Sequence, residues 1–230
     1  MSSSTEHIQV NGEGMELYVS VPEGTGSFPA VVVAQHAGGV DEFIQTMCDR
    51  LAEVGYVAVA PELYHRLPPD QQGPRSLDDV GMVADVQASV DYLKAREDVV
   101  GKNLGVTGFC MGGRVAYLMA AAIPEFNAAV AYYGGNTMVA LGDADKSPFE
   151  RTSEISCPLM FHFGEEDGNP SPEDMKKLDV ELTRYNKVFE FYTYPGAGHA
   201  FMDATGSRYN EAGDKASWPR LIRFFDRHLK

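Results

Sequence analysis

The segment from Gly105 to Arg114 constrains the fold of this chain more than any other. A β-branched run ends at Gly108 and is followed by Phe-Cys-Met-Gly-Gly, after which apolar residues recur at helical spacing. This order predicts a strand, a sharp turn and a helix, with Cys110 on the turn as in a nucleophile elbow, Gly-x-nucleophile-x-Gly. Because Gly108 and Gly112 lack Cβ atoms, the backbones beside the nucleophile can approach closely.

The predicted turn also gives Cys110 a chemical reason to react. A cysteine at a helix N-terminus meets the positive end of the amide dipoles, which stabilise a thiolate. The alternative role is that of a buried structural thiol, which we expect for Cys48 and Cys157 because both adjoin apolar runs. The matching order of an acid and a histidine further along the chain favours the catalytic role for Cys110.

The rest of the chain alternates strand and helix patterns. After a hairpin within residues 8–21, buried strands are expected at Pro29–Ala34, Tyr56–Ala60, Ala128–Tyr133, Leu159–Phe163 and Phe189–Tyr194. Helices are expected at 43–54, where Asp41 is the N-cap and Gly55 the stop, and at 77–95, 115–122, 175–185 and 216–229. This alternation predicts one α/β domain over residues 1–230, a mostly parallel, twisted sheet with helices on both faces.

Two long segments have neither periodicity. Residues 62–76 are rich in proline, and residues 134–156 are polar and irregular. Connections of this kind run over the surface and often border binding sites. We therefore expect the proline-rich loop to lie near the functional site.

Composition limits the partners of the chain. The formal net charge of −14 disfavours nucleic acid and anionic membranes as partners. The sequence shows neither an apolar run of about 18 residues nor a secretory signal. Its three cysteines lack the spacing of a disulfide framework or a metal site. We expect a cytoplasmic protein that acts on a small molecule, as a monomer or a small homo-oligomer.

Three reactive residues follow predicted strands in a meaningful order. Cys110, Asp167 and His199 each come just after a strand, and open α/β sheets bind ligands at the carboxyl ends of their strands. The order nucleophile, acid, histidine is typical of α/β-hydrolases. This chemistry assigns attack to Cys110, proton transfer to His199 and orientation of the imidazole to Asp167. The alternatives are an ordinary loop histidine and, for Asp167 beside two glutamates, a solvated acidic turn.

Acyl transfer also needs two backbone N–H groups for the oxyanion. One is expected from Met111, directly after the nucleophile, and the other from the loop after the Pro29–Ala34 strand. That loop reads His-Ala-Gly-Gly, and the amide of Ala37 is the better candidate within it. The alternative for the two glycines is an ordinary tight turn.

Several longer motifs resemble the dienelactone hydrolase family, which includes the carboxymethylenebutenolidases. They are Gly-Phe-Cys-Met-Gly-Gly at 108–113, Gly-Tyr-Val-Ala-Val-Ala-Pro-Glu-Leu-Tyr-His-Arg at 55–66, Ala-Tyr-Tyr-Gly at 131–134 and Gly-His-Ala-Phe at 198–201. The resemblance covers nearly the whole chain. It implies an α/β-hydrolase fold, a triad of Cys110, Asp167 and His199, and oxyanion amides at Ala37 and Met111. The chemistry of such a triad requires no metal or organic cofactor.

Two positions depart from the family pattern. His36 stands where characterised members have a glutamate that tunes the thiol, and a histidine there could favour a thiolate through contact with Cys110. Asp203 stands where those members hold the substrate carboxylate with an arginine, and its charge should repel such a group. Arg66 and Arg75 in the proline-rich loop are candidates to replace that cation, and a solvated surface role is the alternative for each.

These inferences predict a cysteine-dependent hydrolase of small esters or lactones that works through an acyl-enzyme. The negative charge of the chain and Asp203 favour a neutral or cationic substrate. The first alternative is a carboxymethylenebutenolidase that acts on dienelactone itself. A thioesterase or small-amide hydrolase would use the same residues, and a non-catalytic binding protein would use the same fold.

Overall fold

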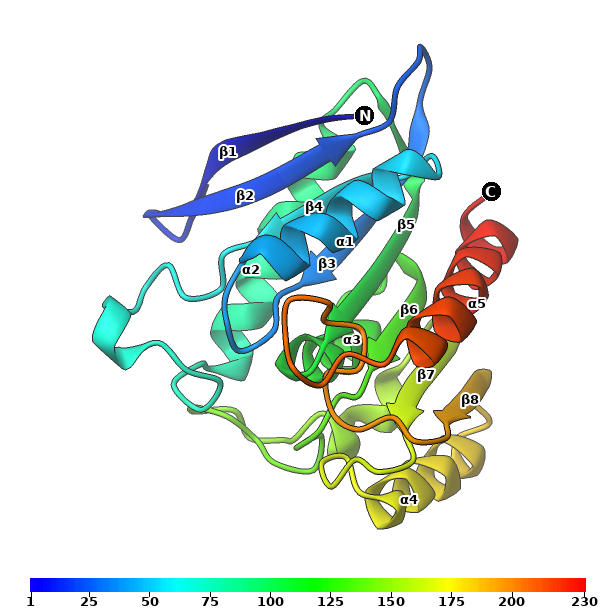
Figure 1. The fold of residues 1–230 in the computed structure, drawn as a ribbon. Helices are drawn as coiled ribbons and strands as arrows, with labels where there is room; N and C mark the ends of the chain where they lie inside the picture. The colour runs from blue at the N-terminus through cyan, green and yellow to red at the C-terminus, as the bar shows by residue number, and fades with distance from the viewer.

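Eight strands form one sheet in the computed structural model, which describes residues 1–230 (Figure 1). Their order in the sheet is β1-β2-β4-β3-β5-β6-β7-β8. The strands are β1 (Ser2–Val10), β2 (Glu13–Val21), β3 (Phe28–Ala34), β4 (Val57–Pro61), β5 (Val99–Phe109), β6 (Phe126–Tyr132), β7 (Leu159–Gly164) and β8 (Phe189–Tyr194). All pairings among β3 to β8 are parallel, whereas β2 is antiparallel to β1 and to β4. The predicted mostly parallel sheet is therefore confirmed.

Helices cover both faces of the sheet, as the alternating pattern predicts. They are α1 (Glu42–Glu53), α2 (Asp79–Lys94), α3 (Met111–Ala122), α4 (Pro172–Arg184) and α5 (Glu211–Leu229). Successive side chains of β3 point to opposite faces, so Val32 packs in a core with α2, α3 and α4, while Val31 and Val33 pack in a second core with α1 and α5. None of these helices has the length and apolar character needed to cross a membrane.

Local sequence signals explain where the first helix begins and ends. The Asp41 carboxylate accepts a hydrogen bond from the backbone N–H of Ile44, which satisfies a free donor of the first turn. Gly55 follows the helix with φ +93°, a conformation that costs glycine little. Both predicted signals are confirmed.

The N-terminal strand is longer than its hydrophobic pattern indicates. The pattern begins near residue 8, but β1 pairs with β2 from Ser2 onward. The first residues of β1 are exposed and polar because this strand lies at an edge of the sheet, and an edge strand with little buried surface has little apolar periodicity.

Helix starts and one short helix also differ from the predictions. The helix predicted from residue 216 begins at Glu211, because the side chain of Asn210 caps it by accepting from Gly213 N–H. The helix predicted from residue 175 begins at Pro172, after a capping box formed by Ser171. Two short 3₁₀ helices, η1 (Pro69–Gln71) and η2 (Phe149–Glu154), lie within the segments predicted to be irregular.

Candidate active site

The predicted sharp turn joins β5 to α3 and carries Cys110 in a strained conformation. Cys110 has φ 57° and ψ −117°, a region that L-residues rarely adopt. A Cβ added to Gly108 would lie 2.0 Å from the carbonyl oxygen of Gly112, and one added to Gly112 would lie 2.1 Å from that of Ala34. The two glycines therefore allow the strand and the helix to pack closely at a sharp turn, and this turn presents the Cys110 thiol at the edge of the sheet.

Cys110, His199 and Asp167 form a continuous chain of contacts at the carboxyl edge of the sheet. The Cys110 Sγ lies 3.0 Å from His199 Nε2, and His199 Nδ1 lies 2.9 Å from Asp167 Oδ2. Asp167 follows β7, and His199 follows β8. The other carboxylate oxygen of Asp167 accepts the backbone N–H of Asn169 at 2.8 Å, which fixes the orientation of this buried side chain.

The electrostatics of these contacts favour a charged cysteine and a charged histidine. Burial raises the pKa of the Cys110 thiol, but the hydrogen bond and charge of His199 and the backbone amides of Met111 and Ala37 outweigh burial, so the pKa is lower than that of an ordinary thiol. Burial lowers the pKa of His199, but Asp167 and Cys110 together raise it to about 9. The lowered pKa of the thiol and the raised pKa of the imidazole together favour a thiolate–imidazolium pair.

The structure places Ala37 in a tight turn beside the nucleophile. The backbone N–H of Gly39 donates to the carbonyl of His36 at 3.1 Å, so Ala37 and Gly38 occupy the centre of the turn. The amides of Ala37 and Met111 both lower the pKa of Cys110, which is the effect expected of N–H groups that converge on a thiolate. The geometry of an oxyanion site requires this convergence.

A cavity of about 450 Å³ opens onto the thiol and the imidazole. Its other lining residues are Pro74, Arg75, Met111, Arg114, Gly135, Asn136, Val139, Leu141 and Asn169. Arg75 is exposed and forms no hydrogen bond or ion pair within the chain, whereas Arg114 is buried against Asp79. No group of three or more His, Cys, Asp or Glu side chains is arranged to hold a metal ion.

The two asparagines of this cavity were missed by the sequence analysis. Asn136 lies just after β6, and its backbone N–H donates to the side-chain oxygen of Asn169 at 3.2 Å. Asn169 comes two residues after Asp167. Their places beyond the carboxyl ends of β6 and β7 could have marked them, because ligands of such sheets bind at that edge.

Comparison with known proteins places this geometry in a family. A family model described as "Dienelactone hydrolase family" matches residues 15–229. The chain belongs to the dienelactone hydrolase family. Membership makes the chain an ester or lactone hydrolase and agrees with the resemblance predicted from its motifs.

Individual relatives of this dienelactone hydrolase family protein agree with that assignment. A candidate carboxymethylenebutenolidase of Salmonella typhimurium is 33% identical, with 98% of this chain and 87% of the relative covered. A candidate 2-oxo-3-(5-oxofuran-2-ylidene)propanoate lactonase of Bradyrhizobium is 29% identical, with 96% and 93% covered. The crystal structure of a candidate dienelactone hydrolase from Klebsiella pneumoniae has a TM-score of 0.91 at 30% identity and covers 98% of both chains.

His36 does not contact the thiol in this dienelactone hydrolase family member. Its Nε2 lies 2.7 Å from Asp41 Oδ2, and its ring packs edge-on against Phe43. A Cβ on Gly38 would lie 2.6 Å from the same nitrogen, so the imidazole folds back over its own turn. The predicted contact between His36 and Cys110 is therefore absent, because the carboxylate of Asp41 holds the ring elsewhere.

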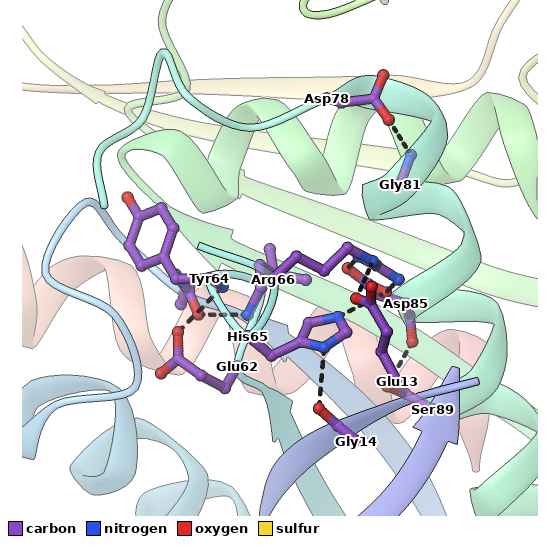
Figure 2. A network of polar contacts seen from close by, with 12 residues as sticks. Glu13, Gly14, Glu62, Tyr64, His65, Arg66, Asp78, Gly81, Asp85 and Ser89 are labelled. Carbon is purple, nitrogen blue, oxygen red and sulfur yellow. Dashed lines mark hydrogen bonds and ion pairs between the residues drawn. The ribbon is translucent and has the colours of Figure 1, made fainter. Parts of the chain in front are cut away.

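Among the four residues predicted to contact substrate, Arg75 alone lines the cavity. Arg66 instead holds both oxygens of Asp85, at 2.8 and 2.6 Å, and reaches Glu13 at 3.2 Å (Figure 2). Asp203 accepts two hydrogen bonds from Thr205 within its own turn. Because Arg66 is engaged in ion pairs with Asp85 and Glu13, Arg75 is the arginine that remains available to a bound substrate.

Proposed function

We propose that this hydrolase cleaves small esters or lactones through a thioester on Cys110. The observation that carries the proposal is the contact chain from Cys110 Sγ to His199 at 3.0 Å and from His199 to Asp167 at 2.9 Å. In such a chain, Asp167 keeps the proton of His199 on Nδ1 and stabilises the imidazolium, which leaves Nε2 to exchange protons with the reacting groups.

Acylation uses the charged pair directly. The Cys110 thiolate attacks the carbonyl carbon, and the carbonyl electron pair moves onto oxygen as an oxyanion held by the N–H groups of Ala37 and Met111. When the tetrahedral intermediate collapses, the bond to the leaving oxygen breaks. The His199 imidazolium gives its Nε2 proton to that oxygen, so an alcohol departs and a thioester remains.

Deacylation reverses these roles. Neutral His199 takes a proton from water through Nε2, and the oxygen of that water attacks the thioester carbon. The second oxyanion uses the same two amides, and its collapse expels the Cys110 thiolate. The carboxylic acid leaves as its anion after losing its proton to solvent, and the thiolate–imidazolium pair is restored.

The cavity favours a substrate that carries a carboxylate. Arg75 offers an unpaired guanidinium there, and the side-chain amides of Asn136 and Asn169 add neutral donors. This local charge argues against the neutral or cationic substrate expected from the net charge, because nearby groups act more strongly than distant ones. The Salmonella and Bradyrhizobium relatives are named as lactone hydrolases, which supports a carboxylate-bearing lactone as the second, narrower candidate.

A panel of substrates tests the mechanism. Wild type, Cys110→Ala and the control Cys48→Ala are assayed with p-nitrophenyl acetate, a neutral lactone and a lactone bearing a carboxylate. Cys48 is a buried thiol on α1, away from the cavity, so its variant should keep its activity. Loss of turnover in Cys110→Ala alone, with a burst equal to one acyl group per active site in wild type, supports the proposal. Full turnover by folded Cys110→Ala would refute it.

A further inference from the structure

Tyr64 contacts both residues that carry the proposed oxyanion amides. Its hydroxyl donates to the carbonyl oxygen of Ala37 at 3.1 Å and lies 3.9 Å from the Met111 sulfur. The side chain is 2% exposed, so water has little access to compete for this hydroxyl. One buried phenol thus connects the two backbone segments that approach Cys110.

The hydrogen bond from the Tyr64 hydroxyl to the Ala37 carbonyl adds a second restraint to the turn formed by residues 36–39. The hydrogen bond from Gly39 to the His36 carbonyl fixes the peptide plane that contains the Ala37 N–H. It leaves the next plane, between Ala37 and Gly38, free to rotate, because glycine opposes such rotation weakly. The Tyr64 hydroxyl holds the carbonyl of this second plane, so both planes around the Ala37 Cα are fixed.

Tyr64 is itself held firmly by its neighbours. The Glu62 carboxylate accepts the backbone N–H of Tyr64 at 3.1 Å and that of Val40 at 3.2 Å, and Val40 directly follows the oxyanion turn. The Gln35 side chain accepts the N–H of Leu63 at 2.8 Å. These bonds join the segment after β4 to the segment after β3.

The residues after Tyr64 extend the same support to a helix. His65 Nε2 lies 3.1 Å from Asp85 Oδ1, and Arg66 grips both oxygens of that carboxylate (Figure 2). Asp85 belongs to α2 and is 1% exposed. In Figure 2 the Tyr64 ring points away from this cluster, so its segment is anchored on one side and presents its hydroxyl on the other.

We infer that Tyr64 is a positioning residue for the oxyanion site, which it serves by fixing the Ala37 turn. The inference rests on the proposed thioester mechanism. Without the hydroxyl, the plane between Ala37 and Gly38 can rotate. Because this plane lies between the two ends of the Gly39–His36 hydrogen bond, its rotation strains that bond and turns the Ala37 N–H away from the oxyanion. Steps that form an oxyanion then become slower. Nucleophilic displacement by the thiolate forms no oxyanion and depends mainly on His199, so it changes little.

Tyr64→Phe tests the inference, because it removes one oxygen and keeps the ring. The control is Tyr56→Phe, which removes an equally buried hydroxyl that donates to Asp226 at 2.7 Å, at the other end of β4. Two rate constants are measured on each protein: the acylation burst with p-nitrophenyl acetate and the alkylation of Cys110 by iodoacetamide. Loss of one direct oxyanion donor costs about 100-fold or more, so an indirect support should cost about tenfold.

The ratio of acylation to alkylation decides the outcome. We expect it to fall about tenfold in Tyr64→Phe, with KM nearly unchanged, and to stay at the wild-type value in Tyr56→Phe. Both rates are taken per titrated thiol, so a lower yield of folded protein does not alter the ratio. An unchanged ratio in Tyr64→Phe would overturn the inference, and it would leave the proposed mechanism standing if Cys110→Ala is inactive.

Discussion

Arg114, which lines the active-site cavity, forms a buried, two-bonded ion pair with Asp79. Arg114 Nη2 donates to Asp79 Oδ2 at 2.9 Å, its Nη1 bonds the other oxygen, and the two side chains are 2% and 4% exposed. The same guanidinium donates to the carbonyls of Asn136 and Val139, and Asp79 accepts the N–H of Leu141. The pair therefore fixes the 136–141 segment, which lines the cavity, against the start of α2.

Breaking this pair should destabilise the protein severely. Asp79→Asn leaves the Arg114 charge buried without its counter-ion, and such a loss costs about 3–5 kcal/mol. Urea unfolding should show this decrease in the free energy of unfolding. Lys177→Ala, which removes an exposed ion pair with Glu173, should leave the midpoint unchanged. A decrease below about 1 kcal/mol in Asp79→Asn would contradict the role given to the pair.

Asp167→Asn should slow catalysis while the fold persists. An amide in place of the carboxylate no longer stabilises the imidazolium and can donate toward Nδ1, so kcat should fall by about 10³–10⁴. Asp203→Asn makes the same chemical change outside the cavity and should stay within about twofold of wild type. Steady-state kinetics with a neutral lactone measures both, and equal losses in the two variants would remove Asp167 from the proposed mechanism.

Two reactions of Cys110 should respond differently to alkaline pH. The pKa of His199 is raised to about 9, so above that value the imidazole is neutral and cannot protonate an alkoxide leaving group. The thiolate persists there, because the Cys110 pKa is lowered. For an alkyl ester, kcat/KM should therefore fall about tenfold per pH unit above pH 9, while alkylation by iodoacetamide stays on its plateau. A parallel fall in both rates would contradict the assignment of His199 as the acid.

Arg75→Ala should selectively weaken the binding of anionic substrates. Loss of a charge-assisted hydrogen bond raises KM for a carboxylate-bearing lactone by about tenfold to hundredfold and leaves a neutral lactone unaffected. Arg208→Ala, which removes another exposed arginine outside the cavity lining, is the matched control. If Arg75→Ala changes the kinetics of both lactones equally, Arg75 does not select for charge.

The chemistry of the site could be predicted from sequence better than its specificity. Cys110, Asp167 and His199 each follow a strand at the carboxyl edge, so strand order alone brings them together. The arginines Arg66 and Arg75 belong to one loop and look equivalent in the sequence. Only the folded chain shows that Asp85, nineteen residues from Arg66, binds the Arg66 guanidinium and so keeps it out of the cavity.

His36 shows the same limit over a shorter distance. Its position in the family pattern suggested contact with Cys110, but Asp41 is only five residues away and folds back onto the ring through the turn. The pairing depends on turn geometry, which residue types alone do not fix. The start of β1 was missed for a different reason, since an exposed edge strand lacks the apolar alternation on which strand prediction rests.

Helix α2 anchors two walls of the cavity, the 62–76 loop through Asp85 and residues 136–141 through Asp79. The reacting groups sit on other elements, at the ends of β5, β7 and β8. Substitutions in the two walls can therefore change which substrate binds without altering the positions of the reacting residues. An engineer who exchanges either wall should keep the two aspartates with their partners Arg66 and Arg114, and should also keep Tyr64.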